Sequence, residues 1–78
     1  MTVERVFVGL GANLGDPRAT LAQALKALAA LPRTRLVAVS PLYRSSPVDA
    51  LGPDFINAAA ELATTLTPRE LLHALQAI

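Results

Sequence analysis

The chain has 78 residues, of which 53% are hydrophobic, and it contains seven basic residues, six acidic residues, one histidine and no cysteine. A domain this short buries only about 60% of the surface that its unfolded chain exposes. The absence of cysteine excludes disulfides and thiolate metal sites, and a net charge of +1 with dispersed basic residues gives no basis for a nucleic-acid partner. Its apolar runs are too short for a membrane span, and no secretory pattern follows the charged residues 4 and 5, so we expect a cytoplasmic protein with no membrane partner.

The first half of the chain predicts a strand, a helix and a second strand. Residues 6–10 form a short run rich in β-formers that stops at glycines, which indicates a strand. Asp16 can cap a helix whose first position is Pro17, and Pro32 ends that helix. Its apolar stripe consists of three leucines, Leu21, Leu25 and Leu28. Residues 36–39 predict a strand buried on both faces or nearly so.

The second half begins with a loop and continues with a strand and a helix. Residues 43–54 are expected to be irregular because they contain two prolines and a glycine. The alanines of residues 55–65 favour a helix by propensity, but their apolar and polar residues alternate, so we predict a strand. Thr67 and Glu70 form a capping box around Pro68, which begins a helix without a stop signal before the chain ends. The apolar stripe of that helix is Leu71, Leu75 and Ile78.

The order strand–helix–strand–strand–helix belongs to the α+β class. It lacks one strand of the ferredoxin-like βαββαβ arrangement. We therefore expect an antiparallel sheet with the helices packed on it, and residues 1–78 to be the N-terminal portion of a single domain whose C-terminal part is missing. Such a fragment exposes unpaired strand edges and apolar surface, so we expect it to self-associate or to remain partly unfolded.

One pair of residues points to a ligand. Phe55 and Asn57 lie two positions apart, so on a strand they project from the same face. A phenyl ring can stack on a planar molecule, and a carboxamide supplies both a hydrogen-bond donor and an acceptor. The pair suits a flat heteroaromatic such as a pterin, a purine or a flavin. The alternative is that Phe55 belongs to the core and Asn57 caps the end of the strand.

A glycine turn, residues 9–15 (GLGANLG), lies between the first strand and the first helix. A dinucleotide-binding fingerprint occurs in this setting. Three features disagree with that fingerprint: the spacing is one residue longer than GxGxxG, Asp16 would repel a phosphate, and no acidic residue follows about twenty positions on to hold a ribose. One feature agrees with it, because Arg35 lies in that region and could meet a 2′-phosphate. The alternative to a nucleotide-binding role is that these glycines only permit a tight turn.

The chain offers no catalytic or metal-binding constellation. His73 is the single histidine, and the six acidic residues form no close pair able to hold Mg²⁺. Ser45 and Ser46 have no histidine nearby in the sequence to act as a base. We therefore assign no catalytic residue and no metal ligand within the 78 residues.

Three segments together resemble the 6-hydroxymethyl-7,8-dihydropterin pyrophosphokinase family. Residues 7–16 (FVGLGANLGD) are similar to its first strand and turn, residues 43–57 to its Y-R-T-x-P-x-G … D-[FY]-[LIV]-N loop and strand, and residues 67–72 (TPRELL) to the helix that follows. The resemblance covers essentially the whole chain but only the first half of a family member. Departures are Ser45 for a threonine, Asp49 for a common glycine and Gly52 for a common glutamine.

The resemblance implies pyrophosphoryl transfer from ATP to the hydroxymethyl group of a reduced pterin, a step of folate biosynthesis. By position, Phe55 would stack on the pterin and Asn57 would hydrogen-bond its pyrimidine edge. Backbone groups near Ser45 and Val48 would complete the pocket, and Gly11 would allow close approach.

The resemblance also implies that ATP and Mg²⁺ take part in the reaction, and that most of the residues that bind them are not among these 78. Gln76 would lie near the nucleotide, whereas the aspartates that bind two Mg²⁺ ions and the basic residues that bind ATP would follow Ile78. We therefore expect a monomeric enzyme in full-length form and no turnover by this chain alone. The alternative is a non-catalytic ferredoxin-like module that binds a small ligand or another subunit.

Overall fold

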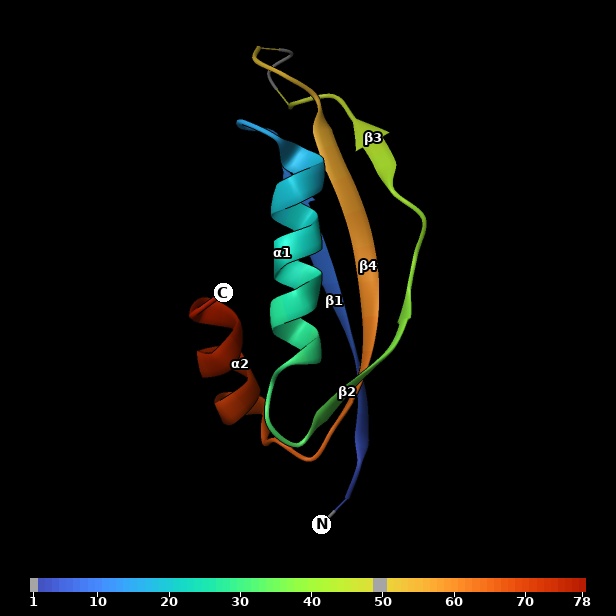
Figure 1. The fold of residues 1–78 in the computed structure, drawn as a ribbon, viewed down its shortest axis with the longest axis vertical. Coiled ribbons are helices and arrows are strands. Elements are labelled where there is room, and N and C mark those ends of the chain that lie inside the picture. Colours follow the sequence, from blue (N-terminus) through green and yellow to red (C-terminus); the bar gives the residue numbers. More distant parts are fainter. Residues whose placement is uncertain (1, 49–50) are drawn as a thin grey trace.

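The computed structural model describes residues 2–48 and 51–78, so Asp49 lies outside the described residues. In chain order the elements are β1 (Glu4–Ala12), α1 (Pro17–Ala29), β2 (Thr34–Val39), β3 (Tyr43–Ser45), β4 (Phe55–Thr64) and α2 (Pro68–Gln76). The described residues form a four-stranded antiparallel sheet with α1 and α2 packed on it (Figure 1). The predicted α+β, ferredoxin-like class is confirmed.

The central strand of the sheet is β4. It pairs with β1 from Glu4 opposite Thr64 to Ala12 opposite Ile56. Its other edge pairs with β2 near the end of β4 and with β3 near its beginning. Each of these pairings is antiparallel. The parallel neighbours required by the dinucleotide-binding alternative are therefore not found in the part of the chain that the structure describes, and that alternative is wrong.

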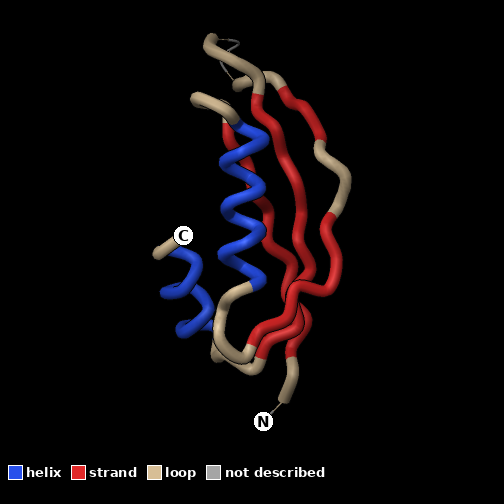
Figure 2. Tube along the Cα trace, viewed as in Figure 1, coloured by secondary structure: helices blue, strands red, loops and turns tan. Residues whose placement is uncertain are grey.

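The two faces of the sheet differ. Alternate residues of β4 point towards the helices and are buried: Ile56, Ala58, Ala60, Leu62 and Thr64. Leu28 of α1 and Leu71 of α2 pack against this face around Leu62, which is fully buried. Both helices lie on the same side of the sheet (Figure 2). The residues of β4 between the buried ones project from the opposite, open face.

Two strand predictions require correction. The first strand does not stop at its glycines, since β1 continues through Gly9 and Gly11 to Ala12 because β4 offers a partner to each residue. The second strand begins earlier, at Thr34, and is not buried on both faces, since Val39 is 42% exposed. Its pairing with β4 shifts between Leu36 and Ala38, where a bulge interrupts the register.

A third correction concerns the loop. Residues 43–45, predicted to be irregular, form the strand β3 against the beginning of β4. Tyr43 lies opposite Asn57, and Ser45 lies opposite Phe55. The strand exists because β2 does not cover this part of the β4 edge, which leaves backbone groups available for pairing.

Both helix starts follow the predicted capping chemistry. The Asp16 side chain accepts a hydrogen bond from the backbone N–H of Ala19 at 3.2 Å. The Thr67 hydroxyl accepts from the backbone N–H of Glu70, and a Glu70 carboxylate oxygen accepts from the Thr67 backbone N–H at 2.8 Å. The other carboxylate oxygen of Glu70 pairs with Arg33 at 3.0 Å, which links α2 to the turn that follows α1.

Lowering the pH tests the contacts that the Glu70 carboxylate makes with Thr67 and Arg33. The backbone N–H and hydroxyl of Thr67, followed by the Arg33 guanidinium, hold the pKa of Glu70 below its ordinary value. A depressed pKa in the folded state stabilises the protein above the unfolded pKa, about 4.3 for glutamate, and this contribution disappears as the pH falls through the folded pKa. Glu70→Gln should therefore lower stability at pH 7 and lose less stability between pH 7 and pH 3, as measured by urea denaturation.

Glu4→Gln is the matched control, because Glu4 is an exposed glutamate at the start of β1, whereas the ion pair of Arg33 is made by Glu70. This variant should show the acid sensitivity of the unmodified chain. An equal loss of stability between pH 7 and pH 3 in the Glu70→Gln variant and the unmodified chain would contradict the stabilising role assigned to the Glu70 carboxylate.

Candidate functional site

Four of the predicted ligand-binding residues meet at one end of the open sheet face. Phe55 and Asn57 begin β4 and are half-buried, whereas Ile56 between them points towards the helices and is 7% exposed. Strand β1 places Gly11 opposite Asn57, and β3 places Ser45 opposite Phe55. Three strands thus bring together four of the predicted residues, and the expectation that Phe55 and Asn57 share a face is confirmed.

The Asn57 carboxamide is held between the two neighbouring strands. Its Nδ2 donates a hydrogen bond to the Ser45 Oγ at 2.7 Å. Its Oδ1 lies 2.9 Å from the position that a Cβ atom on Gly11 would occupy, and the Phe55 ring atom Cδ1 lies 3.9 Å from that same position. A carboxamide has a second N–H and a carbonyl oxygen besides the N–H that Ser45 accepts. The arrangement therefore presents a donor and an acceptor beside an aromatic ring.

Sequence reasoning missed a contact that frames this end of the sheet. The Asn13 side chain donates to the carbonyl of Pro53 at 3.4 Å, so the turn after β1 touches the loop that precedes β4. Gly15 closes the same turn with a φ of 62°, a conformation that favours glycine. A polar amide inside a glycine-rich turn was the available sequence signal.

Two predicted residues stand apart from this group. Val48 is fully exposed after β3, and the residues that follow it lie outside the described ranges. Gln76 is the last residue of α2 and is exposed in the helix layer, on the other side of the sheet from Phe55. The roles suggested for the Val48 backbone and for Gln76 stay predictions.

A separate cavity lies behind Gly11, on the helix side of the sheet. It measures about 460 Å³ and is lined mainly by apolar residues such as Leu10, Leu21 and Leu75. Its lining contains neither an aromatic ring nor a charged side chain. The open face with Phe55 and Asn57 is therefore the better site for a planar polar molecule.

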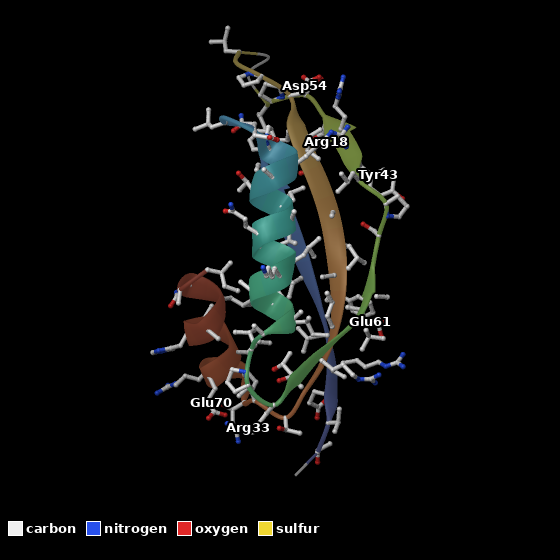
Figure 3. All side chains as sticks on the ribbon, in the orientation of Figure 1. Arg18, Arg33, Tyr43, Asp54, Glu61 and Glu70 are labelled. Atoms are coloured by element: carbon white, nitrogen blue, oxygen red, sulfur yellow. The ribbon has the colours of Figure 1, made fainter. Side chains whose placement is uncertain are left out.

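Charged side chains lie at both ends of the molecule, and Arg18, Arg44 and Asp54 line one pocket beside the beginning of β4. Figure 3 shows Tyr43 and Asp54 at the end of the molecule where β4 begins, whereas Arg33 and Glu70 lie at the opposite end. Within residues 2–48 and 51–78, no group of three or more histidine, aspartate or glutamate side chains could hold a metal ion. The same described ranges contain no helix with the length and hydropathy of a membrane span.

Comparison with known proteins identifies relatives. Residues 7–78 match the family described as 7,8-dihydro-6-hydroxymethylpterin-pyrophosphokinase. The chain is similar to a 2-amino-4-hydroxy-6-hydroxymethyldihydropteridine pyrophosphokinase of Pseudomonas aeruginosa, with 54% identity over 97% of this chain and 48% of the relative. The protein of the same name from Pseudomonas putida is 49% identical over 100% of this chain and 64% of the relative. A bifunctional protein FolKE of Lactococcus lactis is 37% identical over 90% of this chain and 20% of its own length.

The chain therefore spans about half the length of the Pseudomonas aeruginosa protein. The match begins within β1 and runs through α2, so it includes every strand that contributes to the open-face site.

Replacing Ser45 tests how Asn57 is held. Ser45→Ala removes the acceptor of the Asn57 N–H and should shift the side-chain amide signals of Asn57 in an NMR spectrum, while stability changes by about 1 kcal/mol or less. Ser45→Thr keeps the hydroxyl and should leave those signals nearly unchanged. Ser46→Ala serves as the control, and an unchanged Asn57 signal in the Ser45→Ala variant would sink the interpretation.

Proposed function

The chain belongs to the 7,8-dihydro-6-hydroxymethylpterin-pyrophosphokinase family, and from this membership we propose that it supplies the pterin-binding part of an enzyme of folate biosynthesis. The enzyme would transfer a pyrophosphoryl group from ATP to the hydroxymethyl group of 6-hydroxymethyl-7,8-dihydropterin. The chain would bind and orient the acceptor substrate.

The shared face of Phe55 and Asn57 is the observation that supports the proposal most directly. The pterin ring would stack on Phe55, where offset contact between flat rings is favourable. The pyrimidine edge of a pterin presents neighbouring donors and acceptors, and Asn57 offers one of each. Ser45 keeps the carboxamide beside the ring, and backbone groups near Val48 would complete the contact on the β3 side.

The residues present do not suit the metal part of the reaction. Pyrophosphoryl transfer depends on positioning and on stabilisation of developing charge, in which metal ions take the larger share. The described part of the chain contains no group of three or more histidine, aspartate or glutamate side chains that could hold a metal ion, so we assign no metal-dependent step to these residues. We propose that Mg²⁺ ligands and most of the ATP contacts lie outside this chain, with Gln76 near the nucleotide.

Substitution of Phe55 tests the pterin site. Phe55→Leu should weaken binding of 6-hydroxymethylpterin by about tenfold because it removes the stacking ring, whereas Phe55→Tyr should keep the affinity. Binding would be followed by quenching of the pterin fluorescence. Phe7→Leu is the matched control, since Phe7 is an aromatic residue of β1 that is 71% exposed and lies opposite Glu61, away from Asn57.

Equal affinity of the Phe55→Leu variant and the unmodified chain would refute stacking at this position. A non-catalytic module for another ligand predicts no saturable quenching in any variant.

A turnover assay tests the division of the reaction. With ATP, Mg²⁺ and 6-hydroxymethyl-7,8-dihydropterin, the 78-residue chain should form no product above background, because the described residues provide no metal-binding group. The Pseudomonas aeruginosa protein, of which the chain spans 48%, is the positive control. Turnover near the level of that protein would overturn the proposed division.

A further inference from the structure

We propose that Gly11 is a positioning residue for Asn57: its missing side chain leaves the space in which the carboxamide is oriented for the ligand. The sequence had suggested that Gly11 lets a ligand approach the backbone. The structure instead fills the space above Gly11 with the side chain of Asn57. The inference rests on the proposed pterin site for its functional meaning, although the contact itself does not depend on a ligand.

The reason for a glycine at this position is close approach rather than backbone conformation. Gly11 has no positive φ, in contrast to Gly15 at 62° and Gly52 at 81°. A Cβ atom built on Gly11 would lie 2.9 Å from the Asn57 Oδ1, closer than real Cβ atoms come to other heavy atoms. The antiparallel register places these two residues directly opposite each other, so the conflict cannot be relieved by sliding either strand.

The consequence for the carboxamide is a fixed orientation. Ser45 accepts the Nδ2 hydrogen on the β3 side, and Gly11 leaves room for Oδ1 on the β1 side. Donor and acceptor are therefore placed before a ligand arrives, which reduces the entropy lost on binding. A methyl group on Gly11 would meet the far end of a side chain that can rotate, so the fold would tolerate it. The rotation would break the bond to Ser45 and misplace both polar atoms.

Gly9 provides a matched control on the same strand. It lies two residues before Gly11 and projects from the same face, and a Cβ atom built on it would meet nothing within 4 Å. Replacement of either glycine by alanine restricts the unfolded chain to a similar degree, so that effect cancels in the comparison. The difference between the two variants isolates the contact with Asn57.

The primary test needs no ligand. The side-chain amide signals of Asn57 would be recorded by NMR for the unmodified chain, Gly11→Ala and Gly9→Ala. We expect the signals to move in Gly11→Ala towards those of Ser45→Ala, and to stay in place in Gly9→Ala. Unchanged signals in Gly11→Ala, or equal shifts in both glycine variants, would overturn the inference.

Affinity for 6-hydroxymethylpterin is the functional readout. Gly11→Ala should bind about tenfold more weakly, the loss of roughly one well-placed hydrogen bond, while Gly9→Ala should differ by less than about twofold. If Gly11→Ala shifts the Asn57 signals and the unmodified chain binds no pterin, the proposed function fails and the positioning by Gly11 stands. If the chain binds pterin and Gly11→Ala binds equally well, the positioning role fails and the proposed function stands.

The double variant Gly11→Ala/Asn57→Ala distinguishes a specific conflict with Asn57 from a general loss of stability. With Asn57→Ala in the background, a methyl group on Gly11 has the Phe55 Cδ1 at 3.9 Å as its nearest remaining contact, which is an ordinary van der Waals distance. Gly11→Ala should then leave the urea denaturation midpoint of the Asn57→Ala variant unchanged or raise it slightly. A clear loss of stability in that background would show that Asn57 is not the group that Gly11 accommodates.

Discussion

Pairing of β4 with a strand on each edge is the constraint on which the structure depends. Side chains alternate across a strand, so a shift of one residue in register would move Phe55 and Asn57 to the helix side. Burial prevents that shift, since Ala60 and Leu62 of β4 are fully buried beneath the helices. The hydrophobic core on one face therefore fixes the position of polar chemistry on the other.

The molecule separates the contacts that hold α2 from those that form the site. The ion pair of Arg33 and Glu70 links α2 to the turn after α1, and both side chains are half exposed, so the pair contributes little stability by itself. The apolar contacts of Leu28, Leu62 and Leu71 contribute more, because they are removed from water. Substitutions at the open face leave both sets of contacts in place, so changes in ligand binding can be separated from changes in folding.

The sequence predicted correctly the elements whose signals lie in neighbouring residues. The alternation along β4 and the capping box at Thr67 are visible in consecutive residues, and both were confirmed. Strand β3 has three residues, and its existence depends on a vacant stretch of the β4 edge, which no local pattern encodes. The same limit applies to Gly11, because its relation to Asn57 arises only when residues 46 positions apart are placed in register.

The open-face site has the properties of a recognition surface more than those of a complete reaction centre. In the proposed site, the ring of Phe55 and the carboxamide of Asn57 would fix the plane and the edge of a heteroaromatic ligand. They do not stabilise the charge that develops during phosphoryl transfer, since that task requires cations or many donors around the transferred group. Phe55 can stack on only one face of a bound pterin ring. The opposite face of that pterin stays open, so another group can cover it after the pterin is oriented. In the proposed function, recognition by strands β1, β3 and β4 and chemistry by residues elsewhere are therefore separate contributions.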